Sequence, residues 1–186
     1  MPRQLGDGHL NQPTATPANA ARKTGAVSIR ATASLEEQER YGHCFACGAA
    51  NDSGLNLEFE ALENGSVTAL YVPREMHQGW PNVLHGGIVA TLLDEAAAYV
   101  AYARGQHAAT ARLNIRYSHA APLDAPLRVT AALVKDTRRM LTIEARVTTL
   151  EDKKIATAEA TLLLLTPKQE QEYGLIPLTD VTNNNS

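Results

Sequence analysis

The sequence lacks an excess of basic charge and lacks any apolar stretch long enough to cross a membrane. Its formal net charge is -3, which argues against the positive field that draws proteins to nucleic acid or to an anionic membrane surface. A membrane-spanning helix needs about 18 consecutive apolar residues, and Asp94 and Glu95 interrupt the longest candidate. We therefore expect neither nucleic acid nor a membrane as a partner.

Two further absences concern chemistry. No GxSxG motif, which carries the nucleophilic serine of many hydrolases, occurs in the chain. The two cysteines both lie in Cys44-Phe45-Ala46-Cys47, and no second CxxC exists to complete the four ligands of a zinc site. A redox CxxC is expected near a βαβ pattern, whereas a turn at 51–54 follows here. The sequence favours a packed loop ahead of the first strand, and it predicts no metal and no cofactor.

The two ends of the chain differ in composition from its middle. Residues 1–40 are predicted to be a disordered tail, because most of this segment is rich in proline, glycine, asparagine, threonine and alanine without an apolar period. Residues 169–186 are predicted to be a C-terminal tail. Residues 41–168 form the one predicted domain, since 44% hydrophobic residues are enough to bury one sizeable core. No secretory apolar segment is visible, so the expected location is the cytoplasm.

The middle of the chain predicts two strands, one long helix and four more strands. Residues 55–60 and 67–72 are extended runs joined by turn residues at 63–65, which indicates a hairpin. A very apolar helix is predicted from about Gly86 to Arg104, and Gly105 ends it. The later extended runs are 111–117, 127–134, 141–149 and 155–165. The fold class is therefore α+β, with an antiparallel sheet of about six strands and one helix covering its concave face.

Asp94 lies in the middle of this apolar helix. At about 100° per residue, the large side chains fall on the side away from Asp94. The residues on the Asp94 side are small, so another backbone or a slender ligand has room to approach the carboxylate; they are Gly87, Ala90, Thr91, Ala97, Ala98 and Ala101. A symmetric dimer would cover this face together with an exposed sheet edge.

A motif around this helix resembles a known family. The segment Leu84-His85-Gly86-Gly87 is followed by Asp94 and then by the strand Thr110–Tyr117. Over roughly residues 42–166 the chain resembles the hotdog-fold acyl-CoA thioesterases of the phenylacetic-acid-degradation (PaaI-like) type and their mammalian thioesterase-superfamily relatives. The resemblance implies a curved sheet wrapped around the helix, a homodimer or homotetramer, and hydrolysis of acyl-CoA at sites shared between subunits.

The resemblance also implies roles for individual residues. Gly86 matches the glycine whose backbone N–H polarises the thioester carbonyl, and His85 matches a histidine that helps build the carbonyl site. Asp94 matches the acid that acts as nucleophile or as general base on water. Thr110 matches a hydroxyl that orients this water. The acyl-CoA substrate would then be hydrolysed without a serine or cysteine nucleophile.

Other residues are candidates for substrate binding. Relatives often carry Asn or Gln about six residues before the histidine, where this chain has Gly79; the neighbouring Gln78 and Asn82 are therefore candidates for the polar partner of the thioester, which the sequence does not assign. Gly87 offers a second free N–H at the start of the helix. A pair of arginines in a turn, Arg138 and Arg139, is a candidate for binding the CoA phosphates, although such a pair is often simply solvated.

Distance along the helix requires a second subunit. Gly87 and Asp94 are seven residues apart, which is about 10 Å on one helix, so one chain cannot place both on the same carbonyl. Two helices packed antiparallel across a twofold axis would bring Asp94 of one chain opposite Gly86 of the other.

Several alternatives stay open at this point. Asp94 could be a surface residue paired with Arg112 or Arg116, and Glu95 could be a solvated or structural acid. The same architecture could serve a hydratase or dehydratase that uses His85 and Asp94 as a pair. A dimer that binds acyl-CoA without hydrolysing it is a further possibility.

Overall fold

The computed structural model describes residues 26–178 and 180–182. Its seven strands form one sheet in the order β1-β2-β3-β5-β6-β7-β4, with antiparallel neighbours throughout. The strands are β1 (Val27–Ser28), β2 (Glu60–Ala61), β3 (Val67–Tyr71), β4 (Ala108–Tyr117), β5 (Leu127–Asp136), β6 (Met140–Thr149) and β7 (Lys154–Leu164). The helices are α1 (Ile29–Thr32), α2 (Leu35–Tyr41), the 3-10 turn η1 (Glu75–His77), α3 (Gly86–Ala103) and α4 (Pro167–Glu172).

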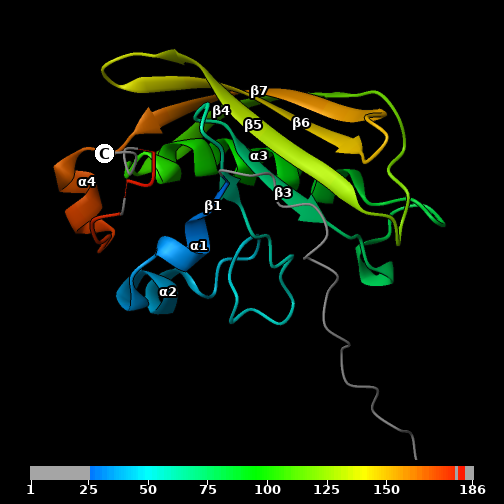
Figure 1. The fold of residues 1–186 in the computed structure, drawn as a ribbon, viewed down its shortest axis with the longest axis horizontal. Coiled ribbons are helices and arrows are strands. Elements are labelled where there is room, and N and C mark those ends of the chain that lie inside the picture. Colours follow the sequence, from blue (N-terminus) through cyan, green and yellow to red (C-terminus); the bar gives the residue numbers. More distant parts are fainter. Residues whose placement is uncertain (1–25, 179, 183–186) are drawn as a thin grey trace, which may run out of the picture.

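Helix α3 is the central element of the fold. In the view of Figure 1 it lies along the sheet, between strands β4–β7 and the N-terminal helices α1 and α2. Strands β5, β6 and β7 bury alternate residues, because successive side chains of a strand point to opposite faces. The buried side of α3 includes Val89, Leu92, Leu93, Ala96 and Val100. The predicted α+β architecture, one long helix packed on a curved antiparallel sheet, is confirmed.

The first predicted strand is much shorter than expected. Residues 55–60 alternate apolar and polar side chains, yet the strand there is limited to Glu60–Ala61. The backbone N–H groups of Leu55 and Leu57 donate instead to the carbonyls of Phe45 and Ala46, at 2.8 and 2.9 Å. The alternation thus comes from pairing with the loop that carries the cysteines, outside the sheet.

Part of the segment predicted to be a disordered tail is folded. Residues 26–40 contain β1, α1 and most of α2, while residues 1–25 lie outside the described part of the chain. Ile29 is buried, and Ser34 caps α2 through a reciprocal capping box with Glu37. These caps act locally and give no long apolar period, so composition alone did not reveal them. Helix α4 similarly begins at the boundary of the predicted C-terminal tail.

The open strip of α3 is narrower than its sequence suggests. Ala97 and Ala101 were expected on the accessible side but are fully buried, because the C-terminal half of α3 is enclosed by the rest of the chain. The exposed or partly exposed small residues that accompany Asp94 are Gly87, Ala90, Thr91 and Ala98. Among the described residues, no helix combines the length and the apolar character that a membrane span requires.

Candidate functional site

The N-terminus of helix α3 is capped by a histidine side chain. His85 is the N-cap, and its Nδ1 accepts a hydrogen bond from the Gly87 N–H at 2.9 Å. The Tyr117 hydroxyl, at the end of β4, donates to the Gly86 carbonyl oxygen at 2.9 Å. The Gly86 N–H is at the first position of the helix, where no partner exists within the helix. This N–H, at the positive end of the helix dipole, can therefore donate to a developing negative charge.

The space available for a side chain differs among the three glycines near His85. A Cβ at Gly87 would lie 3.0 Å from His85 Nδ1, so a side chain there would crowd the cap. A Cβ at Gly79 would lie 3.0 Å from the His85 Cα. At Gly86 the nearest atom to such a Cβ, on the Tyr117 ring, is 3.8 Å away, which is ordinary contact. Packing within the chain explains the first two glycines, whereas packing within one chain does not require a glycine at position 86.

The loop before α3 uses one of the two predicted polar partners for its own structure. Gln78 Oε1 accepts a hydrogen bond from the Asn82 backbone N–H at 2.9 Å, and Asn82 adopts a positive φ of 61°. The Asn82 side chain is exposed. Both residues thus lie in the loop that leads to His85, but the side-chain oxygen of Gln78 already accepts a hydrogen bond within this loop.

Asp94 is paired with a threonine from the edge of the sheet. The Thr110 hydroxyl on β4 donates to Asp94 Oδ1 at 2.8 Å. Asp94 is partly exposed and Thr110 is exposed, and in the described part of the chain this is the only hydrogen bond of the Asp94 carboxylate. Neither Arg112 nor Arg116 forms an ion pair with it there. The carboxylate is therefore oriented and accessible, with one oxygen left for chemistry.

One chain does not bring all the predicted site residues together. Gly86 and Asp94 are eight residues apart on a continuous helix, which is about 12 Å. Arg138 and Arg139 are exposed in the β5–β6 turn. This turn lies at the opposite end of α3, since Arg104, just after the helix, forms a 2.8 Å ion pair with Asp136 at the end of β5. Within one chain the arginines are thus remote from Gly86.

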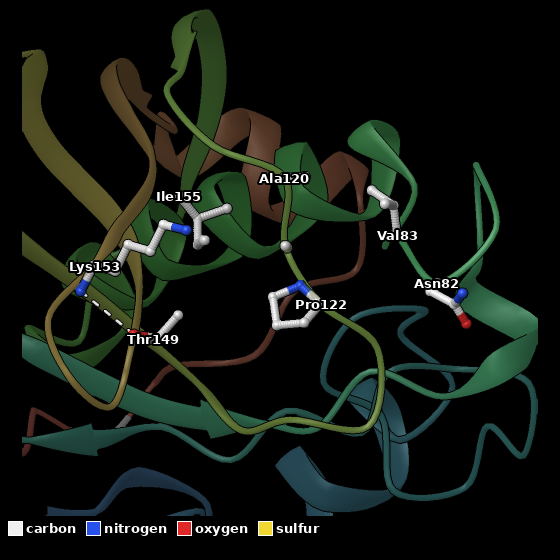
Figure 2. Close-up of a pocket in the computed structure, with 8 residues that line it drawn as sticks. Asn82, Val83, Ala120, Pro122, Thr149, Lys153 and Ile155 are labelled. Atoms are coloured by element: carbon white, nitrogen blue, oxygen red, sulfur yellow. Dashed lines mark hydrogen bonds between the residues drawn. The ribbon is translucent and has the colours of Figure 1, made fainter.

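A small cavity opens beside the loop that precedes α3. It has a volume of about 290 Å³ and is lined by Asn82, Val83, Ala120, Ala121, Pro122, Thr149, Lys153 and Ile155. Figure 2 shows Asn82 and Val83 on one side of Pro122, with Thr149, Lys153 and Ile155 on the other. The Leu84 N–H donates to the Ala121 carbonyl at 3.0 Å, which joins this wall to the residue before His85.

Glu95 faces a different neighbour from Asp94. Its carboxylate lies 3.8 Å from the Cys44 sulfur, and burial raises the pKa of Glu95 to about 7. The hydrogen bond from the Cys47 side chain is the main cause that lowers the pKa of Cys44 to about 5, while the same pairing and burial raise the pKa of Cys47. Tyr99, on the same helix, stacks on Phe59 with ring centroids 4.4 Å apart.

Sequence reasoning missed two parts of this region. Tyr117 was noted only as the end of a strand, although its hydroxyl holds the Gly86 carbonyl; a tyrosine at a strand end carries no signal for this contact. The wall formed by Ala120, Pro122 and Lys153 also went unnoticed, because it comes from two turns that only the folded sheet places beside residue 83.

Comparisons with known proteins agree on one family. Residues 81–156 match the thioesterase superfamily. The acyl-coenzyme A thioesterase THEM4 of Mus musculus is 35% identical over 117 residues, which cover 61% of this chain and 50% of that protein. The protein of the same name from Rattus norvegicus is 30% identical over the same shares. The chain spans about half the length of the curated relatives it matches.

Solved structures show the same fold. A thioesterase superfamily protein superposes with a TM-score of 0.62 at 28% identity, covering 65% of this chain and 60% of that chain. A Streptococcus mutans protein bound to acetyl CoA gives 0.56 at 24% identity, covering 59% and 89%. A hypothetical thioesterase of Streptococcus pneumoniae, solved as one aspartate-to-alanine and one threonine-to-alanine variant, gives 0.55 at 23% identity, covering 59% of this chain and 89–90% of that protein.

Proposed function

We propose that this chain, which matches the thioesterase superfamily over residues 81–156 and shares its fold with a solved thioesterase superfamily protein, hydrolyses acyl-CoA thioesters to a free acid and CoA. The observation that carries this proposal is the 2.8 Å hydrogen bond from Thr110 to Asp94, which orients an accessible carboxylate. The relatives are named acyl-coenzyme A thioesterases, and one solved neighbour is bound to acetyl CoA.

The Streptococcus pneumoniae variants add support for this pair of residues. In these variants an aspartate or a threonine is replaced by alanine, and the threonine follows the aspartate by sixteen positions. Thr110 follows Asp94 by the same sixteen positions. The equal spacing supports Asp94 and Thr110 as the functional pair in this chain.

In the proposed reaction, Asp94 acts on the thioester carbonyl either directly or through water. As general base, the free carboxylate oxygen takes a proton from water while the water oxygen bonds to the carbonyl carbon. The carbon–sulfur bond then breaks, and the CoA sulfur leaves and takes up the proton. As nucleophile, an Asp94 oxygen bonds to the carbonyl carbon, the carbon–sulfur bond breaks and the CoA thiolate leaves; water then cleaves the resulting acyl anhydride to the free acid and restores the Asp94 carboxylate. In both routes the Gly86 N–H stabilises the negative charge on the carbonyl oxygen.

The proposed site combines two subunits. The separation of about 12 Å between Gly86 and Asp94 on one helix prevents them from reaching one carbonyl. Strand β4, with ten residues, has a free edge and is largely exposed, and such an edge favours pairing with a second copy. The partly open strip of Gly87, Thr91, Asp94 and Ala98 then lets a partner's Gly86 approach Asp94.

The hydratase alternative is less well supported. It requires a histidine and an acid acting together on the acyl chain. Within one chain, His85 Nδ1 is engaged by the Gly87 N–H, and Asp94 is engaged by Thr110. The two side chains thus bond different partners. This arrangement fits a hydrolase in which His85 belongs to the carbonyl site and Asp94 is a separate base.

The test is a thiol-release assay on the full chain with short, medium, long and aromatic acyl-CoAs. We expect release of free CoA with at least one class, and no change in enoyl-CoA absorbance beyond that caused by hydrolysis. Hydration of enoyl-CoA without thiol release would favour the hydratase. Binding of CoA without turnover of any acyl class would favour a non-catalytic binding protein.

A further inference from the structure

The loop that carries the two cysteines folds as a tight turn that begins at Cys44. The Gly48 N–H donates to the Cys44 carbonyl at 3.0 Å. A Cβ at Gly48 would lie 2.6 Å from both the N and the O of Cys44, so a side chain does not fit there. The turn holds the two cysteine sulfurs within 4.8 Å of each other, and cysteine binds metals as the thiolate.

Helix α3 brings a third group to this turn. The Cys44 sulfur, the Cys47 sulfur and a carboxylate oxygen of Glu95 all lie within 4.8 Å of one another. In a tetrahedral zinc site, bonds of about 2.3 Å to sulfur and about 2.1 Å to oxygen place the ligand atoms about 3.5–3.8 Å apart. Cys44 and Glu95 are already at 3.8 Å. Small side-chain rotations therefore suffice for all three atoms to bind one ion.

The three groups gather without a cationic side chain bonded to them. In the described part of the chain, Glu95 forms no ion pair. All three residues are partly buried. Cysteine and glutamate bind metals in their deprotonated forms, and a divalent cation placed between two sulfurs and a carboxylate would offset the negative charge of those forms.

We propose that Cys44, Cys47 and Glu95 bind one zinc ion, with a water molecule completing the tetrahedron. Calcium and magnesium prefer oxygen ligands, whereas thiolates together with a carboxylate suit zinc. The proposal departs from the sequence-based prediction of no metal. The third ligand is 48 positions beyond Cys47, so only the folded chain places it beside the cysteines.

The ion would fasten the cysteine loop to helix α3. This loop is also held by Arg30, which donates to the carbonyls of Cys47 and Leu57 at 2.5 and 2.9 Å. Glu95 follows Asp94 directly, but the two carboxylates contact different groups, the cysteines and Thr110 respectively. The proposed zinc site is thus distinct from the proposed hydrolytic site, although helix α3 contributes a residue to each.

The experiment measures metal in the full chain, expressed with supplemented zinc and purified without a histidine tag or chelators. We expect close to one zinc per chain by elemental mass spectrometry. Replacement with Co²⁺ should give a sulfur-to-cobalt charge-transfer band and the visible bands of a tetrahedral ion. Wild-type protein without zinc and without a cobalt–thiolate band would overturn the proposal, as would an intact mass showing a Cys44–Cys47 disulfide in the freshly purified protein.

Matched variants assign the ligands. Glu95→Gln should weaken zinc binding at least about tenfold, in line with the loss of a charged ligand, and Cys47→Ser should abolish the cobalt–thiolate band. Asp94→Asn, which changes the neighbouring carboxylate, should keep the full metal content. Circular dichroism checks that each variant is folded. Equal zinc affinity in folded Glu95→Gln and wild type would refute the carboxylate ligand. Because metal content is read without any substrate, a failure of the proposed hydrolase activity leaves this test unaffected.

Discussion

Replacing Asp94 by asparagine separates the role of its charge from the role of its shape. The asparagine side chain has the same size, and its Oδ1 can still accept the hydrogen bond that Thr110 donates at 2.8 Å. A hydrogen bond to a charged group contributes about 1.5–3 kcal/mol and a neutral one about 1 kcal/mol. The free energy of unfolding should therefore fall by only about 1 kcal/mol, which lowers Tm by about 2–4 °C in a chain of this size.

The effect on catalysis should be much larger. A positioned general base contributes about 10²–10⁴ in rate, and each factor of ten corresponds to about 1.4 kcal/mol. We expect kcat to fall by at least about 10² in Asp94→Asn, a cost of roughly 3 kcal/mol or more in activation free energy. Thiol release measures kcat, and thermal unfolding measures stability.

The matched control is Thr91→Ser, a small change on the same partly open strip that leaves Asp94 intact. It should retain activity within a few fold. An Asp94→Asn protein that is folded and keeps more than about a tenth of wild-type kcat would refute the role of this carboxylate as base or nucleophile, since no such role is compatible with so small a loss.

Three further predictions concern Gly86, the shared site and pH. Gly86→Ala should leave stability unchanged or raised by up to about 1 kcal/mol, because alanine favours helices and its Cβ meets nothing closer than 3.8 Å. Thiol release should nevertheless fall, because the added methyl group lies next to the N–H proposed to bind the carbonyl oxygen; wild-type activity would refute the need for a glycine there. If the sites are composite, equal mixing and reassembly of Gly86→Val and Asp94→Asn subunits, each inactive alone, should restore about a quarter of wild-type activity, because half the dimers are mixed and each has one intact site; no recovery from mixed dimers would place the whole site in one chain. His77 is buried and its Nδ1 contacts the Tyr71 hydroxyl at 2.6 Å; burial lowers its pKa below the usual 6.5. The associated stability is present above about pH 6.5 and is lost as pH falls toward the folded-state pKa, so Tm measured between pH 7.5 and 5.5 should fall more steeply in wild type than in His77→Asn.

The sequence was most informative where the apolar period is long. Strands β5, β6 and β7 and helix α3 were predicted close to their observed bounds, because each presents a continuous apolar face to one core. Short elements were harder to predict. The folded segment 26–40 depends on serine caps and single buried residues such as Ile29, and the run at 55–59 takes its alternation from pairing with the cysteine loop.

The sequence by itself determined which chemical groups lie along helix α3: the glycines and histidine at its start and a carboxylate about two turns later. It also determined that a threonine follows this carboxylate sixteen positions further along the chain. The tertiary structure decided which groups meet, because contact depends on elements far apart in the chain. Folding turned Asp94 toward Thr110 and Glu95, one residue later, toward Cys44 and Cys47. Adjacent residues on a helix point about 100° apart, so the environment of each was set by what packs on its own side.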